Sequence, residues 1–489
     1  MKFLKRITLW ALLLLVLLAV YVLINTFRTT SKQIKADKID VVKLSELSKE
    51  RFSEAIAIKT VSPEDIADFD SIQFDAFNQF LKTSYPLTDS LLGHKVFNNY
   101  SHLYKWEGSA AELKPVVLMA HLDVVPVIDQ NIQYWREDPF AGTITNDTIW
   151  GRGTIDDKIG IVGLMESIEY LLEKGYQPER SILFAFGHDE EIGGSLGAKT
   201  IASYLEEQGI RAEFVMDEGG SLTRGLIPGL DKDVAMIGIA EKGFVTLKLS
   251  IKMEGGHSSM PAKETSIDVM ADAIAKLKKN PFPATISEPL DALIDYLGPE
   301  MPFVNRMAFA NKDIFKPLII NAYESTASGN ALVRTTTSPT IFNSGVKDNI
   351  IPLSANATVN FRVIPGSNVD EVIAHVKKVV DDDRIKIAQA SYNIGPSKVS
   401  SLTSLGFTKI NRTIAQVFPE ALVTPHMVVG ATDARHFSRI SDQIYRFSPI
   451  TISKDNIKSF HGLNERIALS DLELAITFYG QLIRNISSE

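Results

Sequence analysis

The sequence predicts an α/β fold in which helices cover a mostly parallel central sheet. Apolar runs at residues 116–120, 181–186 and 212–216 have the length and composition of buried strands. Between the first two runs, residues 156–174 carry apolar side chains at helical spacing, and this pattern ends at Gly175, a residue type that often follows a helix. Strand, helix and strand in this order are typical of a parallel sheet with helices on its faces.

A change of pattern near residue 240 predicts a second domain inserted into the first. Residues 244–253 and 355–363 alternate polar and apolar side chains, as strands with one exposed face do. Two amphipathic helices are expected at 266–278 and 369–380, with a further insertion between about 280 and 345. The expected domains are residues 46–239 and 399–489 for the larger one and 240–398 for an inserted α+β domain.

The N-terminus predicts a single membrane-spanning helix within residues 1–28. Basic residues precede an uncharged apolar run at 7–27, which has about the 20 residues that a bilayer-spanning helix needs. A polar, Lys-rich stretch at 29–45 is expected to form a stalk. We expect a short cytoplasmic tail and an extracytoplasmic body. A cleaved signal peptide, which would give a secreted protein, is the alternative, although no Ala-x-Ala pattern ends the run.

Composition limits the partners and the kinds of site. The net charge is −8, and the isoelectric point is about 5.7, which argues against nucleic acid as a partner. Because the chain has no cysteine, thiolate nucleophiles and Cys-ligated metals are excluded. Any metal must therefore be held by His, Asp and Glu side chains.

Acidic and histidine residues follow each of the three predicted strands. His121 and Asp123 end the first, and because they are two positions apart in extended chain, Asp123 can orient the ring of His121. Glu190 and Glu191 follow the second strand, and Asp217 ends the third. A Gly-rich turn containing Asp156 and Asp157 lies between them in sequence. Since sites in open α/β sheets form beyond the carboxyl ends of strands, this set predicts a carboxylate-bridged metal site.

The chain resembles the M20 metallopeptidases, and within them the branch of carboxypeptidase S and the N-fatty-acyl-amino acid synthase/hydrolases. The resemblance extends from about residue 45 to 470. It is carried by six ordered motifs: MAHLDVVP at 119–126, WGRGTIDDK at 150–158, FGHDEEIGG at 186–194, MDEGG at 216–220, GGHSSMP at 255–261 and HGLNE at 461–465.

The resemblance implies two zinc ions per chain. One zinc would be held by His121, Asp156 and Asp217, and the other by Glu191, His461 and the shared Asp156. The same family pattern implies a cis peptide bond after Asp156. It also makes Glu190 the general base, which takes a proton from the attacking water and passes it to the leaving nitrogen.

The resemblance also assigns roles to three residues of the inserted domain, which in this family is a lid of the dimerisation type. His257 would stabilise the tetrahedral oxyanion, and in dimeric members this residue comes from the partner subunit, so a homodimer is possible. Arg362 and Asn349 match positions that bind the substrate carboxylate in related aminoacylases. The alternative for His257 is an ordinary histidine in a turn, and the alternative for Arg362 is an exposed charge on a strand.

These features predict a zinc hydrolase that cleaves an amide bond next to a free carboxylate. The substrate is either the C-terminal residue of a short peptide or an N-acyl amino acid. The insertion at about 280–345 is rich in Phe, Leu and Ile, which can line an acyl tunnel or form only lid core. A membrane-tethered binding protein on an inactive peptidase fold is the remote alternative, but all expected ligands and Glu190 are present.

Overall fold

The computed structural model describes residues 2–63 and 65–487, and its largest element is a ten-stranded mixed sheet. The order of strands in this main sheet is β1 (Gly93–Phe97), β2 (Ser101–Trp106), β6 (Ile182–Gly187), β3 (Val116–His121), β7 (Val215–Asp217), β17 (Ile444–Arg446), β9 (Val234–Glu241), β8 (Leu222–Arg224) and β18 (Thr451–Ser453), with β16 (Leu422–Val428) also paired to β9.

The centre of the main sheet is parallel and its flanks are mixed, because β16 is parallel to β9 and β18 is parallel to β8. Strands β6, β3, β7 and β17 run in the same direction, whereas β1 and β2 form an antiparallel hairpin on β6, and β9 is antiparallel to both β17 and β8. The expectation of a mostly parallel sheet is therefore corrected to a mixed sheet. The physical reason is the short turn between β1 and β2, since parallel neighbours need a long crossover connection.

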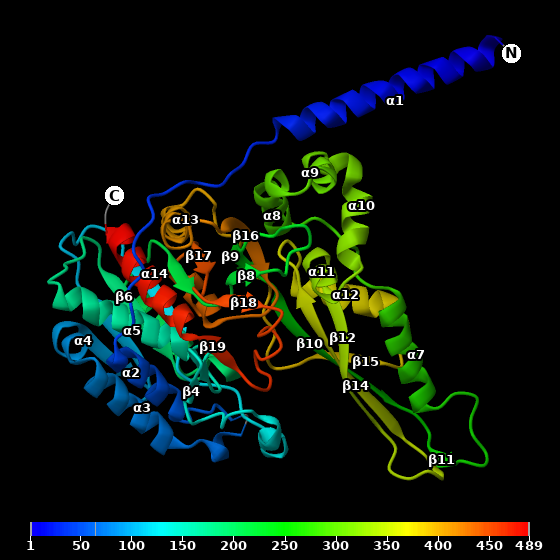
Figure 1. The fold of residues 1–489 in the computed structure, drawn as a ribbon. Helices are drawn as coiled ribbons and strands as arrows, with labels where there is room; N and C mark the ends of the chain where they lie inside the picture. The colour runs from blue at the N-terminus through cyan, green and yellow to red at the C-terminus, as the bar shows by residue number, and fades with distance from the viewer. Residues whose placement is uncertain (1, 64, 488–489) are drawn as a thin grey trace.

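Helices cover both faces of the main sheet (Figure 1). Leu118 and Phe184 pack into one core, and their neighbours Val117 and Leu183 pack into the other, as alternation along a strand requires. The first core also receives side chains of α2 (Glu46–Ala57), α3 (Ser71–Ser84), α5 (Lys158–Glu173), α13 (Leu405–Val417) and α14 (Leu469–Ser487), and of Tyr85 and Leu92, which flank α4 (Pro86–Leu91). The second receives α6 (Ala198–Glu207) and the 3-10 helix η5 (Asp433–Arg439).

A second, four-stranded antiparallel sheet has its own core. Its order is β12 (Thr336–Ser344), β14 (Ser354–Val363), β10 (Gly243–Lys252) and β15 (Lys386–Gln389). Helices α7 (Ser266–Lys279) and α12 (Val369–Val380) pack against it, close to their predicted positions. At the far tip of this sheet, β11 (Gly256–His257) pairs with β13 (Ile350–Ile351) (Figure 1).

Four further helices lie within the range expected for the inserted domain. They are α8 (Glu288–Leu297), α9 (Phe303–Ala310), α10 (Lys312–Glu324) and α11 (Ala327–Val333). Leu290 and Leu293 of α8 share a core with Val234 of β9 and Leu422 of β16, so this helical insert packs on the main sheet rather than on the second sheet. The range 240–398 is thus divided between two cores, because apolar composition does not indicate which surface an element covers.

Most of the N-terminal helix α1 (Lys2–Arg28) projects away from the body, and only its C-terminal end lies beside α9 (Figure 1). It is long and apolar enough to cross a membrane, although a signal sequence has the same properties. The segment at 29–45, expected as a stalk, follows the body closely. Gln33 exchanges two hydrogen bonds with the backbone of Val423, at 3.0 and 2.7 Å, and the backbone N–H of Val42 donates to Thr477 Oγ1 at 2.9 Å.

Candidate active site

The ends of three neighbouring strands place the predicted residues at one edge of the main sheet. Strands β6, β3 and β7 are adjacent and parallel, so the residues that follow them gather on the same side. His121 ends β3, the 3-10 helix η3 (Glu190–Ile192) begins three residues after β6, and Glu218 follows β7.

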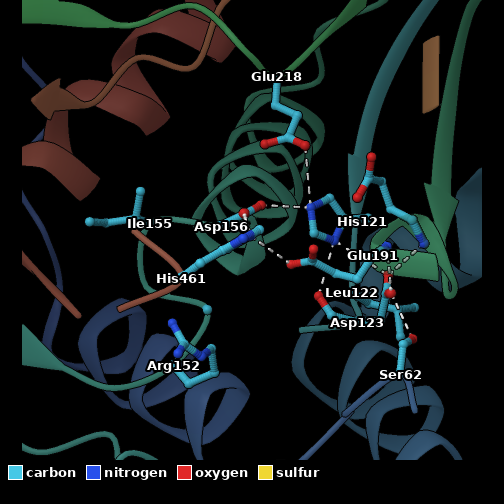
Figure 2. Close-up of polar contacts among 12 residues, drawn as sticks. Ser62, His121, Leu122, Asp123, Arg152, Ile155, Asp156, Glu191, Glu218 and His461 are labelled. Carbon is cyan, nitrogen blue, oxygen red and sulfur yellow. Dashed lines mark hydrogen bonds and ion pairs between the residues drawn. The ribbon is translucent and has the colours of Figure 1, made fainter. Parts of the chain in front are cut away.

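Asp156 lies at the centre of this group, in the turn between β5 (Thr148–Trp150) and α5. Its Oδ1 is 2.8 Å from Nε2 of His121, and its Oδ2 is 2.7 Å from Nε2 of His461 (Figure 2). Each carboxylate oxygen therefore faces a different imidazole, which is the arrangement of a bridging ligand. The Asp156–Asp157 peptide bond is cis, as the motif led us to expect.

Two sets of potential metal ligands share this carboxylate. His121, Asp156 and Glu218 form one set, and Asp156, Glu191 and His461 form the other, with the ligand atoms of each set within 4.8 Å of one another. Glu218 Oε1 is 3.4 Å from His121 Nε2, and Glu191 Oε1 is 3.3 Å from His461 Nε2. The second set is the one that the sequence analysis named.

The first set contains Glu218 where the sequence analysis expected Asp217. The Asp217 carboxylate instead accepts a hydrogen bond from the backbone N–H of Ala434 at 2.8 Å. Successive side chains of an extended strand point to opposite sides, so only one of two adjacent acids can face His121. Glu218 is the acid of this pair that lies within reach of His121.

Asp123 connects His121 to the loop that carries the expected base. Its Oδ1 is 3.3 Å from His121 Nδ1, and its carboxylate accepts hydrogen bonds from Ser62 Oγ at 2.7 Å and from the backbone N–H groups of Glu190 and Glu191 at 3.1 Å. Burial raises the pKa of Asp123, but the contacts with His121 and Ser62 outweigh it and hold the pKa below its usual value. An ionised Asp123 thus fixes the orientation of the imidazole.

The carboxyl group of Glu190 has a strongly perturbed acidity. Burial, together with the nearby carboxylates of Asp433, Glu218 and Glu191, raises the pKa of Glu190 well above its usual value, although His121 acts in the opposite direction. A carboxylate with a raised pKa is a better proton acceptor near neutral pH than an ordinary surface glutamate. Bound cations would lower this pKa again, so the shift describes the protein without metal.

The profile of peptidase family M20/M25/M40 matches residues 117–485, which carry every ligand described above. The chain belongs to this family. It is therefore an enzyme of the metallopeptidase and amidohydrolase type.

Relatives with assigned names cover nearly the whole of this M20 chain. It is 41% identical over 483 residues to the probable carboxypeptidase S-like 2 of Dictyostelium discoideum, a match covering 96% of this chain and 92% of that protein. It is 38% identical over 485 residues to the N-fatty-acyl-amino acid synthase/hydrolase PM20D1 of Xenopus tropicalis, covering 97% and 94%. Carboxypeptidase S of Saccharomyces cerevisiae is 31% identical, with coverage of 90% and 84%.

Solved structures share the fold of this M20 chain at low sequence identity. The M20 metallo-carboxypeptidase Sso-CP2 of Sulfolobus solfataricus has a TM-score of 0.66 and 19% identity, with 91% of this chain and 100% of that chain covered. The YXEP protein of Bacillus subtilis, described as a dinuclear metal binding peptidase of the M20 family, has a TM-score of 0.57 and 12% identity, with 89% and 97% covered.

A cavity of 780 Å³ opens onto the ligand cluster, and Arg362 of β14 lines it together with these carboxylates. The guanidinium carbon of Arg362 lies 4.7 Å from the centre of the Phe244 ring, and burial and the nearby Arg435 lower the pKa of Arg362. The other lining residues include Asp156, Glu190, Glu191, Gly219, Tyr392, Val428, Val429, Phe460 and His461. Among the residues that the structure describes, none from the insertion at 280–345 lines this cavity.

His257 and Asn349 lie elsewhere, at the tip of the second sheet (Figure 1). His257 is in β11, and the backbone carbonyl of Asn349 accepts a hydrogen bond from Ser258 N–H at 3.2 Å. Both residues are exposed, and neither lines the cavity. Arg362 is near the opposite end of β14, paired with Phe244 of β10, so the structure separates it from Asn349 within one chain.

Two further residues of the M20 motifs, Arg152 and Glu465, have no role predicted from the sequence. Glu465 is fully buried and accepts hydrogen bonds from the backbone N–H groups of Gly153, Ile155 and Asp156 at 3.1, 2.8 and 3.3 Å. It also pairs with Arg152. Because Glu465 follows His461 closely, it fixes the loop of one ligand to the turn of the other. The position of Glu465 in the HGLNE motif was the feature of the sequence that could have indicated this role.

Proposed function

We propose that this M20 enzyme is a two-zinc hydrolase that cleaves an amide bond next to a free carboxylate. The observation that carries the proposal is Asp156, whose two oxygens face His121 and His461 separately. A second carboxylate accompanies each imidazole, and imidazole with carboxylate is a donor set that suits zinc. Glu191 Oε1 is buried without accepting a hydrogen bond, as expected of an atom reserved for a cation.

The proposed reaction uses Glu190 as the base. Two zinc ions held by His121, Asp156, Glu218, Glu191 and His461 would supply Lewis acidity to the scissile carbonyl and the attacking water. Glu190, which lines the cavity beside these ligands, takes the proton from the water as it attacks and delivers it to the leaving nitrogen. Asp123 keeps His121 in position throughout, through its contact with Nδ1.

Arg362 is the proposed binding group for the substrate carboxylate. Arg362 lines a cavity whose other charged side chains are mainly acidic, so together with Arg435 it provides a cationic region in the same cavity as the cluster. A guanidinium can bind a carboxylate with two parallel hydrogen bonds, and this second fixed point sets the orientation of the scissile bond. Asn349 of the same chain is hydrogen-bonded to the turn after β11, at the far tip, so any contribution from it requires a second chain or a movement of the second sheet.

A homodimer formed through the second sheet would bring the tip residues to an active site. Strand β12 is a nine-residue edge strand, and its Ile341 and Phe342 are exposed. A long edge strand with exposed apolar residues is a template for pairing with another chain. We propose that His257 of the partner subunit then stabilises the oxyanion, with Asn349 near the substrate.

Two substrate classes fit the site, short peptides and N-acyl amino acids, and the named relatives include both kinds of enzyme. Aromatic and aliphatic residues such as Phe244, Val429 and Phe460 line the cavity, which favours an apolar group on the acyl side. The test is the turnover of matched dipeptide and N-acyl amino acid panels by the zinc-loaded enzyme. Turnover of either class supports the proposed reaction, and turnover of neither class contradicts it.

We also propose that α1 is an uncleaved anchor, with the body outside the cytoplasm. The full-length chain is then expected to stay with membranes through a high-salt wash. Recovery of a soluble chain that begins near residue 28 would contradict the anchor and establish cleavage and secretion.

A further inference from the structure

The last turns of α1 are fixed to the helical insert by hydrogen bonds. Asn311 Nδ2 donates to Val22 O at 3.1 Å and to Thr26 Oγ1 at 3.3 Å, and Asn25 Nδ2 donates to Asn311 Oδ1 at 3.1 Å. Arg306 Nη2 donates to Thr29 O at 2.7 Å. Thr26 is completely buried in this contact, so the end of α1 is part of a packed interface with α9.

The chain directly after α1 is bound to the body by side-chain contacts. Lys32 Nζ pairs with Asp295 of α8 at 3.2 Å, and Gln33 forms its two hydrogen bonds with Val423 directly afterwards. The helical insert therefore keeps a fixed position beside the C-terminal end of α1. Figure 1 shows α8 and α9 immediately next to this end.

The insert exposes apolar side chains close to the same place. These side chains belong to α9 and α10, and we call them the insert face. They are Phe303, Val304, Ile314 and Leu318, which are 50%, 68%, 40% and 59% exposed. The ring centroids of Phe27 and Phe303 are 6.0 Å apart, so the insert face continues from the end of α1. Ile314 and Leu318 are four positions apart and share one side of α10.

We propose that the insert face lies in the interfacial layer of the bilayer that α1 spans. This inference rests on the proposed membrane anchor. The end of a spanning helix lies at the membrane–water boundary, and α9 is packed against that end. The polar groups of Asn311 and Arg306 are directed to α1, which spares them from contact with lipid.

The attraction is mainly apolar. Of the two lysines of α10, Lys312 is paired with Asp291 and Asp295 at 2.5 and 2.8 Å, and Lys316 is exposed between Ile314 and Leu318. The insert face is thus suited to neutral as well as anionic lipids. Because α1 already holds the protein at the bilayer, apolar side chains beside its end can enter the acyl boundary without the entropy loss of recruiting a free protein to the membrane.

The absence of cysteine from the whole sequence permits a direct test on the full-length chain. Val304→Cys and Leu318→Cys are labelled with an environment-sensitive nitrobenzoxadiazole dye and reconstituted in phosphatidylcholine vesicles, with or without a doxyl-labelled lipid quencher. Val346→Cys is the matched control, because Val346 is 94% exposed in the turn between β12 and β13, away from α1. Zinc content identical to the wild type checks that each labelled protein is folded.

Both insert positions are expected to show blue-shifted emission and severalfold stronger quenching by doxyl lipid than position 346. If the protein resists alkaline extraction but the dye at 304 or 318 emits like the dye at 346, the proposal that the insert face lies in the bilayer is contradicted. The proposed anchor would then still hold. A blue shift without lipid quenching would also contradict the proposal for the insert face, because another protein chain would then cover the face. Release of the protein by alkaline extraction would overturn the anchor as well, independently of enzymatic activity.

Discussion

His121 and His257, two histidines of the M20 motifs, have opposite surroundings. His121 is buried and has Asp123, Asp156 and Glu218 around its ring. His257 is exposed, and its Nδ1 accepts hydrogen bonds only from Ser259, a residue of its own turn, among the described contacts. The difference indicates that one chain completes the metal-ligand cluster by itself, whereas the tip of the second sheet acquires a role only through a second chain or a movement.

The largest predicted effect concerns the metal-ligand cluster around His121. Glu190→Gln keeps the size of the side chain but removes the proton acceptor, so kcat is expected to fall by about 100- to 10,000-fold. Zinc content is expected to stay unchanged, because Glu190 is in neither ligand set. Glu173→Gln, at the exposed end of α5, is the control with full activity. A nearly active Glu190→Gln enzyme would mean that another group accepts the proton.

The second prediction concerns the tip. His257→Ala is expected to lower kcat by about 100- to 1,000-fold, as the loss of one oxyanion donor does, with no change in thermal stability because the residue is exposed. Val346→Ala, at the same end of the second sheet, is the control.

Subunit mixing distinguishes a second chain from a movement. His257→Ala and Glu190→Gln are each expected to have strongly reduced activity alone, but a mixed dimer contains one site with both residues intact if His257 acts across the dimer. Partial recovery of activity in the mixture is expected. A mixture as inactive as its components, from chains shown to exchange, would place His257 in the site of its own chain.

The third prediction concerns Arg362, which links the two regions. Removing a charge-assisted contact costs about 1.5–3 kcal/mol, so Arg362→Ala is expected to lower kcat/KM by about ten- to hundredfold. Amidating the substrate carboxylate should have the same effect on the wild type and little further effect on the variant. Additive losses would show that Arg362 does not bind the carboxylate.

The cluster was largely predictable from sequence, and the tip was not, for a physical reason. The ends of β3, β6 and β7 are marked by apolar runs, and parallel neighbours bring those ends together. That Glu218 rather than Asp217 lies beside His121 depends on which side of the strand end faces the cluster, a detail that composition does not reveal. The relation of Arg362 to Asn349 depends on the length of β14, since a position 13 residues away along an extended strand is distant.

The smallest predicted effect is a pH dependence in the metal-free protein. The hydrogen bond with Asp156 and the ion pair with Glu191 raise the pKa of His461 to about 10, so the imidazolium is present at neutral pH. Because this pKa is raised above the ordinary value of 6.5, the stabilisation is complete below pH 6.5 and is lost as the pH rises towards 10. His461 is partly exposed, so solvent screening reduces the effect.

Thermal unfolding of the metal-free protein measures this dependence. The Tm of the wild type is expected to exceed that of His461→Ala at pH 6.5, and the difference should shrink at pH 9.5 and above. Zinc must displace the same proton, so zinc binding at neutral pH should release protons, which calorimetry in buffers of different ionisation enthalpy detects. A difference in Tm that is constant with pH would contradict the assigned ion pairs.

The central claim is that Asp156 bridges two zinc ions, and zinc content tests it most directly. After zinc loading and removal of free metal, about two ions per chain are expected in the wild type, about one in His461→Ala and none tightly bound in Asp156→Ala, because only Asp156 belongs to both ligand sets. Circular dichroism spectra identical to the wild type check that the variants are folded. Fewer than one ion per wild-type chain, or two ions retained by Asp156→Ala, would contradict the bridged site.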